Sequence, residues 1–180
     1  MRNPPVIFLS GDNVLWGTEV VKRKQLPKYA AFLCDLPPAQ VPKEVRKWIT
    51  DEVAWGLTFL EAHTACTFVF ASSMRRWLKQ DGFRSLLREC GVSCWERACI
   101  TSSDFSNTYD AVEDYVRRDS ALMKNPVVWF DSYPPAEKNG YQRGVPVIHV
   151  SAQQGSLNAD HVYGFLRRLD ARDPTLLCKL

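Results

Sequence analysis

The chain has 180 residues, of which 46% are hydrophobic and 24% charged, and its formal net charge is +3. This length and apolar content predict one domain, over residues 1–180, with a full hydrophobic core. The nearly balanced charge does not indicate a dedicated nucleic-acid binder, although it leaves nucleic acid open as a partner. No stretch approaches the roughly 20 apolar residues that would span a bilayer.

The six cysteines include no Cys-x-x-Cys pair, and no histidine stands at a ligand spacing from them, so the sequence does not predict a zinc site. Near the amino terminus Arg2 is followed by Pro4 and Pro5, which is unlike a secretory signal. We therefore expect a cytoplasmic protein with reduced thiols and no membrane association.

The first predicted element is a buried strand over residues 6–9, which leads into a polar turn at residues 10–13. A Pro-rich segment at about 22–43 follows, and its prolines disfavour a long helix there. We expect this segment to be an insertion or a cap-like excursion over the site. A helix is then predicted from near Pro42. Its apolar residues share one face and are Val45, Trp48, Ile49, Val53, Leu57 and Leu60.

The rest of the chain alternates strands with helices. A strand at 67–71 precedes a helix that stops at Gly91, where glycine is favoured just past a helix end. Further elements are predicted as a short strand at 98–100, a helical stripe at 111–116, strands at 126–130 and 145–150, and a closing helix at 159–169 capped by Asn158. The alternation predicts an α/β fold, a three-layer, Rossmann-like domain with a mainly parallel central sheet.

Three of the predicted strands end in small polar or acidic residues. Because right-handed crossovers keep parallel strands pointing the same way, these ends are expected at one edge of the sheet. The residues concerned are Ser10 and Asp12, then Ser72 and Ser73, then Asp131 and Ser132.

In this order the strand ends resemble the motifs of the haloacid dehalogenase (HAD) superfamily of phosphohydrolases. The first motif of that family is four apolar residues followed by Asp-x-Asp-Gly-x-Leu. Asp12 and Leu15 match it, whereas Ser10 stands at the nucleophile position and Asn13 at the glycine position. Asn13 tolerates the left-handed backbone that glycine would otherwise supply.

The later motifs are similar to those of small HAD domains found with RNA-repair enzymes and in bacterial mobile elements. Residues 68–75 resemble the second motif, residues 127–132 the fourth, and residues 155–162 the segment before the last helix. The third motif supplies a Lys or Arg near the start of a helix. The matching helix is expected to begin near Thr108, and residues 102–108 contain no basic residue.

The resemblance implies a role for each strand-end residue. Asp12 would be the general acid and base, and Ser10 holds the place of the lost nucleophile. Ser72 and Ser73 would contact phosphate, and Asp131 would bind Mg²⁺. The alternative for Asp12 is a turn residue bonded to its own backbone, and for Asp131 a cap or turn acid.

Three functions stay open at this point. The first is a catalytically degenerate HAD-like domain, a pseudo-phosphatase that binds a protein partner or a phosphorylated ligand and needs no cofactor. The second is an active Mg²⁺-dependent phosphatase with an altered nucleophile, acting for example on nucleic-acid ends. The third is a phosphate- or nucleotide-binding module without turnover. Ser10, Ser132 and the missing basic residue favour the first, because a hydroxyl is a poor Mg²⁺ ligand beside a carboxylate.

Overall fold

The computed structural model describes residues 3–17, 35–105, 108–118, 124–132, 144–151 and 156–177. Most of the predicted Pro-rich insertion, residues 22–34, lies outside these ranges, and so does Gly155 of the predicted segment before the last helix. Within the described residues, none of the helices combines the length and the apolar character that crossing a bilayer would require.

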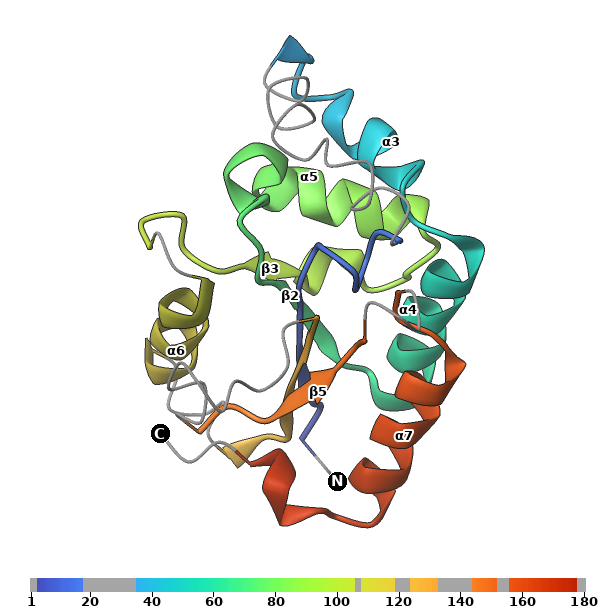
Figure 1. Cartoon of the computed structure of the whole chain (residues 1–180), viewed down its shortest axis with the longest axis vertical. Coiled ribbons are helices and arrows are strands. Elements are labelled where there is room, and N and C mark those ends of the chain that lie inside the picture. The colour runs from blue at the N-terminus through green and yellow to red at the C-terminus, as the bar shows by residue number, and fades with distance from the viewer. Residues whose placement is uncertain are drawn as a thin grey trace.

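A five-stranded sheet with every pair parallel forms the centre of the fold, in the order β3-β2-β1-β4-β5 (Figure 1). β1 therefore lies in the middle, between β2 and β4. The strands are β1 (Val6–Leu9), β2 (Thr67–Phe70), β3 (Cys99–Ile100), β4 (Val127–Asp131) and β5 (Val147–His149).

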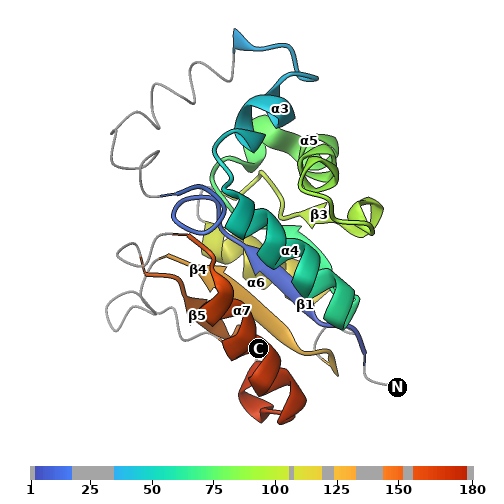
Figure 2. The same cartoon turned by 90° about the vertical axis from the view of Figure 1, so that its right-hand side faces the viewer.

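Helices cover both faces of the sheet, so the predicted α/β class with three Rossmann-like layers is confirmed. Figure 2 shows α4 and α7 in front of the strands and α6 behind them. Alternate residues of β1 explain this: Ile7 and Leu9 face the larger core, while Phe8 faces α6. The helices are α3 (Val41–Arg46), α4 (Asp51–Thr64), α5 (Arg75–Glu89), α6 (Thr108–Arg118) and α7 (Ala159–Asp170), with short 3₁₀ turns at Trp95–Arg97 and Pro174–Leu176.

The single helix predicted from Pro42 to Leu60 is wrong, because the chain forms two helices, α3 and α4, in its place. Thr50 adopts an extended backbone, and its Oγ1 accepts a hydrogen bond from the Val53 N–H at 3.3 Å, which starts a new helix. The predicted apolar face is nevertheless buried throughout, since both helices pack on one core.

The helix predicted after β2 is present as α5, and it carries a break that the sequence did not indicate. Lys79 has φ 53° and ψ 175°, which lies in the left-handed half of backbone space. The helix ends as predicted: Gly91 has φ 86°, and the N–H of Val92 donates to the Leu87 carbonyl at 3.0 Å.

The last helix, α7, begins with the predicted cap. Asn158 Oδ1 accepts the N–H of His161 at 3.3 Å, and the Asn158 N–H donates to Nδ1 of His161 at the same distance. This reciprocal pair satisfies two amide groups at the helix start. The N–H of Leu157 also donates to the Val14 carbonyl at 3.0 Å, so the loop before α7 is fixed to the loop after β1.

Candidate functional site at the carboxyl edge of the sheet

The strand ends meet at one edge, as their order along the chain predicts. Leu9 is paired with Phe70 on one side and with Phe130 on the other. The N–H of Ser10 donates to the Phe130 carbonyl at 3.1 Å, and the N–H of Ala71 donates to the Leu9 carbonyl at 2.9 Å. The residues that follow β1, β2 and β4 are therefore neighbours, although the roles assigned to them stay predictions.

Ser10 forms the centre of a buried hydrogen-bond network. Its hydroxyl donates to Oδ1 of Asp131 at 2.8 Å and accepts the indole Nε1–H of Trp129 at 2.9 Å. The N–H of Ser132 donates to the same Asp131 oxygen at 2.9 Å. Ser10 is only 7% exposed and Asp131 only 3%. Both groups thus have hydrogen-bond partners inside the protein, as buried polar groups require.

Asp12 is turned toward the indole of Trp16. The Trp16 Nε1–H donates to Oδ1 of Asp12 at 2.9 Å, so the side chain bonds to another side chain and not, as the turn interpretation supposed, to its own backbone. Burial raises the pKa of the Asp12 carboxyl, and the hydrogen bond from Trp16 partly offsets the rise. A raised pKa suits a proton donor, but it also follows from burial alone.

The turn that carries Asp12 has a compact backbone. The N–H groups of Val14, Leu15 and Trp16 converge on the Gly11 carbonyl at 3.3, 2.9 and 3.2 Å. Asn13 has φ 58°, so it supplies the left-handed residue that the resemblance places at the glycine position. A Cβ at Gly11 would lie 2.2 Å from Cζ2 of Trp16, so no larger residue fits there without a shift.

The two serines after β2 differ in position. Ser72 is 5% exposed, and its Oγ accepts the N–H of Met74 at 3.3 Å. The same Oγ would lie 2.7 Å from a Cβ at Gly11, so Ser72 contacts the turn after β1. Ser73 is exposed. Of the two predicted phosphate contacts, only Ser72 therefore lies against the turn after β1.

Arg75 is a central residue that sequence reasoning did not single out. Only 2% of it is exposed, and burial, with a smaller contribution from Arg76, lowers the pKa of its guanidinium. The guanidinium donates four hydrogen bonds, to the carbonyls of Ser72 (2.7 Å), Ser102 (2.8 Å) and Phe105 (2.5 Å) and to Oγ1 of Thr108 (3.3 Å).

These contacts bear on the absence of a basic residue at positions 102–108. Arg75 enters this window from the start of α5, so its guanidinium bonds to residues of a segment that has no basic residue of its own. Its hydrogen bonds hold the segment after β3 and the first residue of α6. The arginine at the end of the second motif was the available signal, but periodicity does not show where its side chain reaches.

His149 is a second residue that sequence reasoning missed. Parallel pairing of β4 with β5 places His149 opposite Asp131. Its ring Nε2 lies 3.0 Å from the Ser132 carbonyl, so the tautomer that makes this hydrogen bond carries the proton on Nε2. His149 is distant from Asp131 in sequence, and only the pairing of β4 with β5 brings the two residues together.

The Mg²⁺ site that the resemblance implies does not fit this arrangement. Within the described ranges, no group of three or more His, Cys, Asp or Glu side chains is placed to hold a metal ion. Asp131 accepts the Ser10 hydroxyl and the Ser132 amide, and Asp12 accepts the Trp16 indole. Mg²⁺ prefers anionic oxygens in octahedral geometry, and position 10 offers a hydroxyl whose proton already points at a carboxylate.

Comparisons with known proteins add nothing to this geometry. Neither protein-family models, nor curated proteins, nor solved structures gave a match to this chain. The function of the edge therefore has to be inferred from its own residues.

Proposed function

We propose that this chain is a HAD-like domain that has lost phosphohydrolase activity and acts by binding a protein partner or a phosphorylated ligand. The observation that supports the loss is the state of the Ser10 hydroxyl, which donates to Asp131 and accepts from Trp129 while almost fully buried. A phosphorus atom could approach this oxygen only after both contacts were disturbed.

The chemistry at position 10 also argues against turnover. A carboxylate nucleophile is ionised at neutral pH, whereas a serine hydroxyl needs a general base within hydrogen-bond reach. A phosphoserine formed at Ser10 would hydrolyse far less readily than an aspartyl-phosphate. Binding without turnover is the function that remains, and we propose no cofactor for it.

One contact favours a second candidate, an active phosphatase in which Ser10 is the nucleophile. Asp131 Oδ1 lies 2.8 Å from the Ser10 hydroxyl, which is the distance a general base needs. A carboxylate is a weak base for a serine, and the Trp129 N–H bond lowers the electron density on the attacking oxygen. The degenerate function therefore explains the full set of contacts better.

We further propose a cytoplasmic location. Cys66, Cys90, Cys94 and Cys99 are free thiols, which suits a reducing compartment. Burial raises the pKa of Cys66 to about 12 and that of Cys90 to about 11, so both behave as small core residues.

Phosphate release from 4-nitrophenyl phosphate in the presence of Mg²⁺ tests the proposal. The natural chain is expected to release none above a protein-free blank. Ser10→Asp restores the carboxylate of the family motif, and Ser10→Asn is its uncharged control of similar size. Turnover only in Ser10→Asp would show that the residue at position 10 is by itself what prevents phosphate hydrolysis in the natural chain.

The contrary result is turnover by the natural chain. If that activity disappears in Asp12→Asn, the degenerate proposal is wrong and Asp12 acts as the acid and base. If it disappears in Asp131→Asn and in Ser10→Ala, the serine-nucleophile candidate is favoured. Circular dichroism of each variant must show that the fold is retained.

A further inference from the structure

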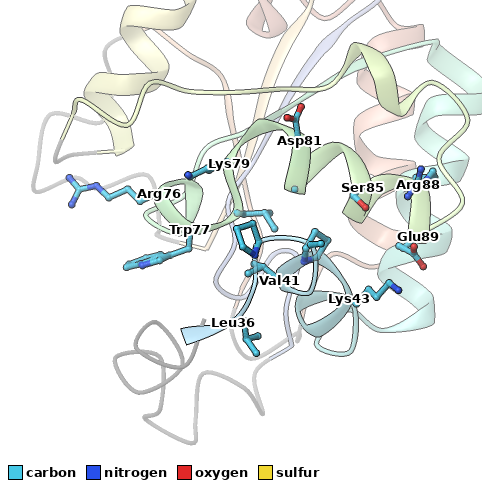
Figure 3. A pocket seen from close by; sticks show the side chains of 15 residues that line it. Leu36, Val41, Lys43, Arg76, Trp77, Lys79, Asp81, Ser85, Arg88 and Glu89 are labelled. Atoms are coloured by element: carbon cyan, nitrogen blue, oxygen red, sulfur yellow. The ribbon is translucent and has the colours of Figure 1, made fainter. Parts of the chain in front are cut away.

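A groove of about 730 Å³ lies between α3 and α5, apart from the Ser10 network (Figure 3). Its base is formed where the two helices touch: a Cβ at Gly82 would lie 3.7 Å from Cγ of Pro42 and 3.3 Å from Cδ1 of Leu78. This volume is within the range of roughly 300–1,000 Å³ that is usual for small-molecule sites. Its apolar lining comes from Leu36, Pro38, Val41, Pro42, Trp77 and Leu78.

The rim of the groove is mainly cationic. Lys43, Arg76, Lys79 and Arg88 line it, against Asp81 and Glu89. In Figure 3 the Asp81 carboxylate points away from the α3 side of the groove, and Glu89 lies beside Arg88 and Lys43, at the end away from Arg76 and Lys79. The rim therefore presents an excess of positive charge beside an apolar floor.

Three of these cations lack an acidic partner within the part of the chain that the structure describes. No acidic side chain of the described residues forms an ion pair with Lys43, Arg76 or Lys79, and all three are exposed. Other exposed cations of the chain do have such partners: Lys47 pairs with Glu44 at 2.6 Å and Arg118 with Asp114 at 2.8 Å. Unpaired cations around an apolar floor complement an anionic, partly apolar ligand.

The backbone of α5 gives independent support for a ligand site in the groove. Lys79 keeps a left-handed φ of 53° within the helix, a conformation that costs a non-glycine residue stability. This break lies at the groove itself, between Trp77 and Asp81 of its lining. Backbone outliers of this kind cluster at ligand-binding sites, and this outlier is one of the three cations without an acidic partner among the described residues.

We propose that the α3–α5 groove binds an amphipathic organic anion, a ligand with an apolar body and one carboxylate, sulfonate or phosphate group. The apolar body lies against the half-buried Leu36 and Trp77, over the buried Pro42 and Leu78, and the anionic group faces Arg76 and Lys79. This site goes beyond the function proposed for the carboxyl edge, because none of the residues that line the groove belongs to the Ser10 network.

Isothermal titration of the full chain with dodecanoate tests this proposal, with dodecylammonium as the cationic counterpart of the same length. Saturable binding of one dodecanoate is expected, with dodecylammonium at least about tenfold weaker. Equal binding of the two amphiphiles, or no binding of dodecanoate, would overturn the proposal. 1-Anilinonaphthalene-8-sulfonate, displaced by dodecanoate, extends the test to a sulfonate.

Charge-reversal and groove-filling variants test whether dodecanoate binds in the groove. Arg76→Glu combined with Lys79→Glu is expected to weaken dodecanoate binding about tenfold or more. The matched control, Lys124→Glu with Arg167→Glu, makes the same charge change outside the groove and should leave the affinity unchanged. Ala39→Trp fills the groove and keeps its charge, so it should abolish binding.

Two results would contradict this placement. The first is a control pair that weakens binding as much as the groove pair does. The second is a dimer, seen in sedimentation of the natural chain, that dissociates in Ala39→Trp, since the groove would then be an interface between copies of this chain. Circular dichroism and the unfolding midpoint of each variant distinguish a folding defect from a specific loss of ligand binding.

Discussion

The carboxyl edge and the α3–α5 groove use their polar side chains in opposite ways. At the edge, Ser10, Asp131 and Arg75 are buried and bonded to other parts of the protein. In the groove, Arg76 and Lys79 are exposed and have no anion among the described residues. A site whose groups satisfy one another is stable, and a ligand at the edge has to bind without displacing these bonds. The proposed groove site instead offers cations that no described acidic side chain neutralises.

The largest expected effect is at Arg75. Arg75→Met removes a buried cation and leaves its four acceptors without that donor, so we expect the free energy of unfolding to fall by about 3–5 kcal/mol. Urea unfolding at pH 7 measures this. Arg76→Met is the matched control, because Arg76 is exposed and its replacement should change stability by less than about 0.5 kcal/mol. Similar losses in both variants would show that the loss does not come from the buried hydrogen bonds of Arg75.

Gly11→Ala tests how tightly the edge is closed. The new Cβ would stand 2.2 Å from the Trp16 ring and 2.7 Å from Ser72 Oγ, so a loss of about 2 kcal/mol is expected from overpacking. Gly164→Ala, where a Cβ meets nothing within 4 Å inside α7, should instead stabilise the chain by about 0.5–1 kcal/mol. A neutral Gly11→Ala would mean that the turn has room to move.

His161 makes the cap of α7 sensitive to pH. Burial, the largest cause, lowers the pKa of His161, so the unfolded chain binds the proton more tightly and stability falls as the pH drops below neutral. Protonation also removes the Nδ1 acceptor of the Asn158 N–H. His161→Gln keeps a capping-box residue without a charge, and it should remove about 1 kcal/mol of the loss between about pH 7 and pH 5. An unchanged pH profile would exclude His161 as its source.

The smallest effect on stability is expected at Asp12. Its protonation favours the folded state, whereas protonation of His161 disfavours it. Because burial raises its pKa, the folded state holds this proton more tightly, and the ionised carboxylate destabilises the fold at neutral pH. Asp12→Asn is therefore expected to stabilise the chain at pH 7 by up to about 1 kcal/mol, and the gain should disappear as the pH falls through the raised pKa. Urea midpoints at pH 7 and at about pH 4 measure this. A destabilised Asp12→Asn would show that the Trp16 bond needs the charge.

Local signals in the sequence account for much of the fold. Residues 6–9 are apolar on both sides of the strand, which is typical of a parallel strand covered on both faces. Asn158 begins a helix because its side chain accepts a backbone N–H, and Gly91 ends one because a residue without a side chain readily adopts a positive φ. The break at residues 47–50 was missed because apolar spacing runs through it, while the Thr50 cap and its neighbouring acids gave the weaker signal.

The contents of the edge were harder to predict, because they depend on which strands are neighbours. Ser10 bonds to Trp129 and Asp131 because β1 lies beside β4, and His149 lies opposite Asp131 because β5 pairs with β4. Periodicity identifies strands but not their order in the sheet. Arg75 shows a further limit: its spacing marks the start of a helix, while its long side chain bonds to a segment 27 to 33 residues away.

A calorimetric titration of the natural chain with Mg²⁺ tests most directly whether the edge is saturated by its own side chains. We predict no saturable heat, because Asp131 already accepts hydrogen bonds from Ser10 and Ser132. Saturable binding of Mg²⁺ that is lost in Asp131→Asn would contradict this account, since it would show that the carboxylate is free to hold the metal on which the phosphohydrolase chemistry depends.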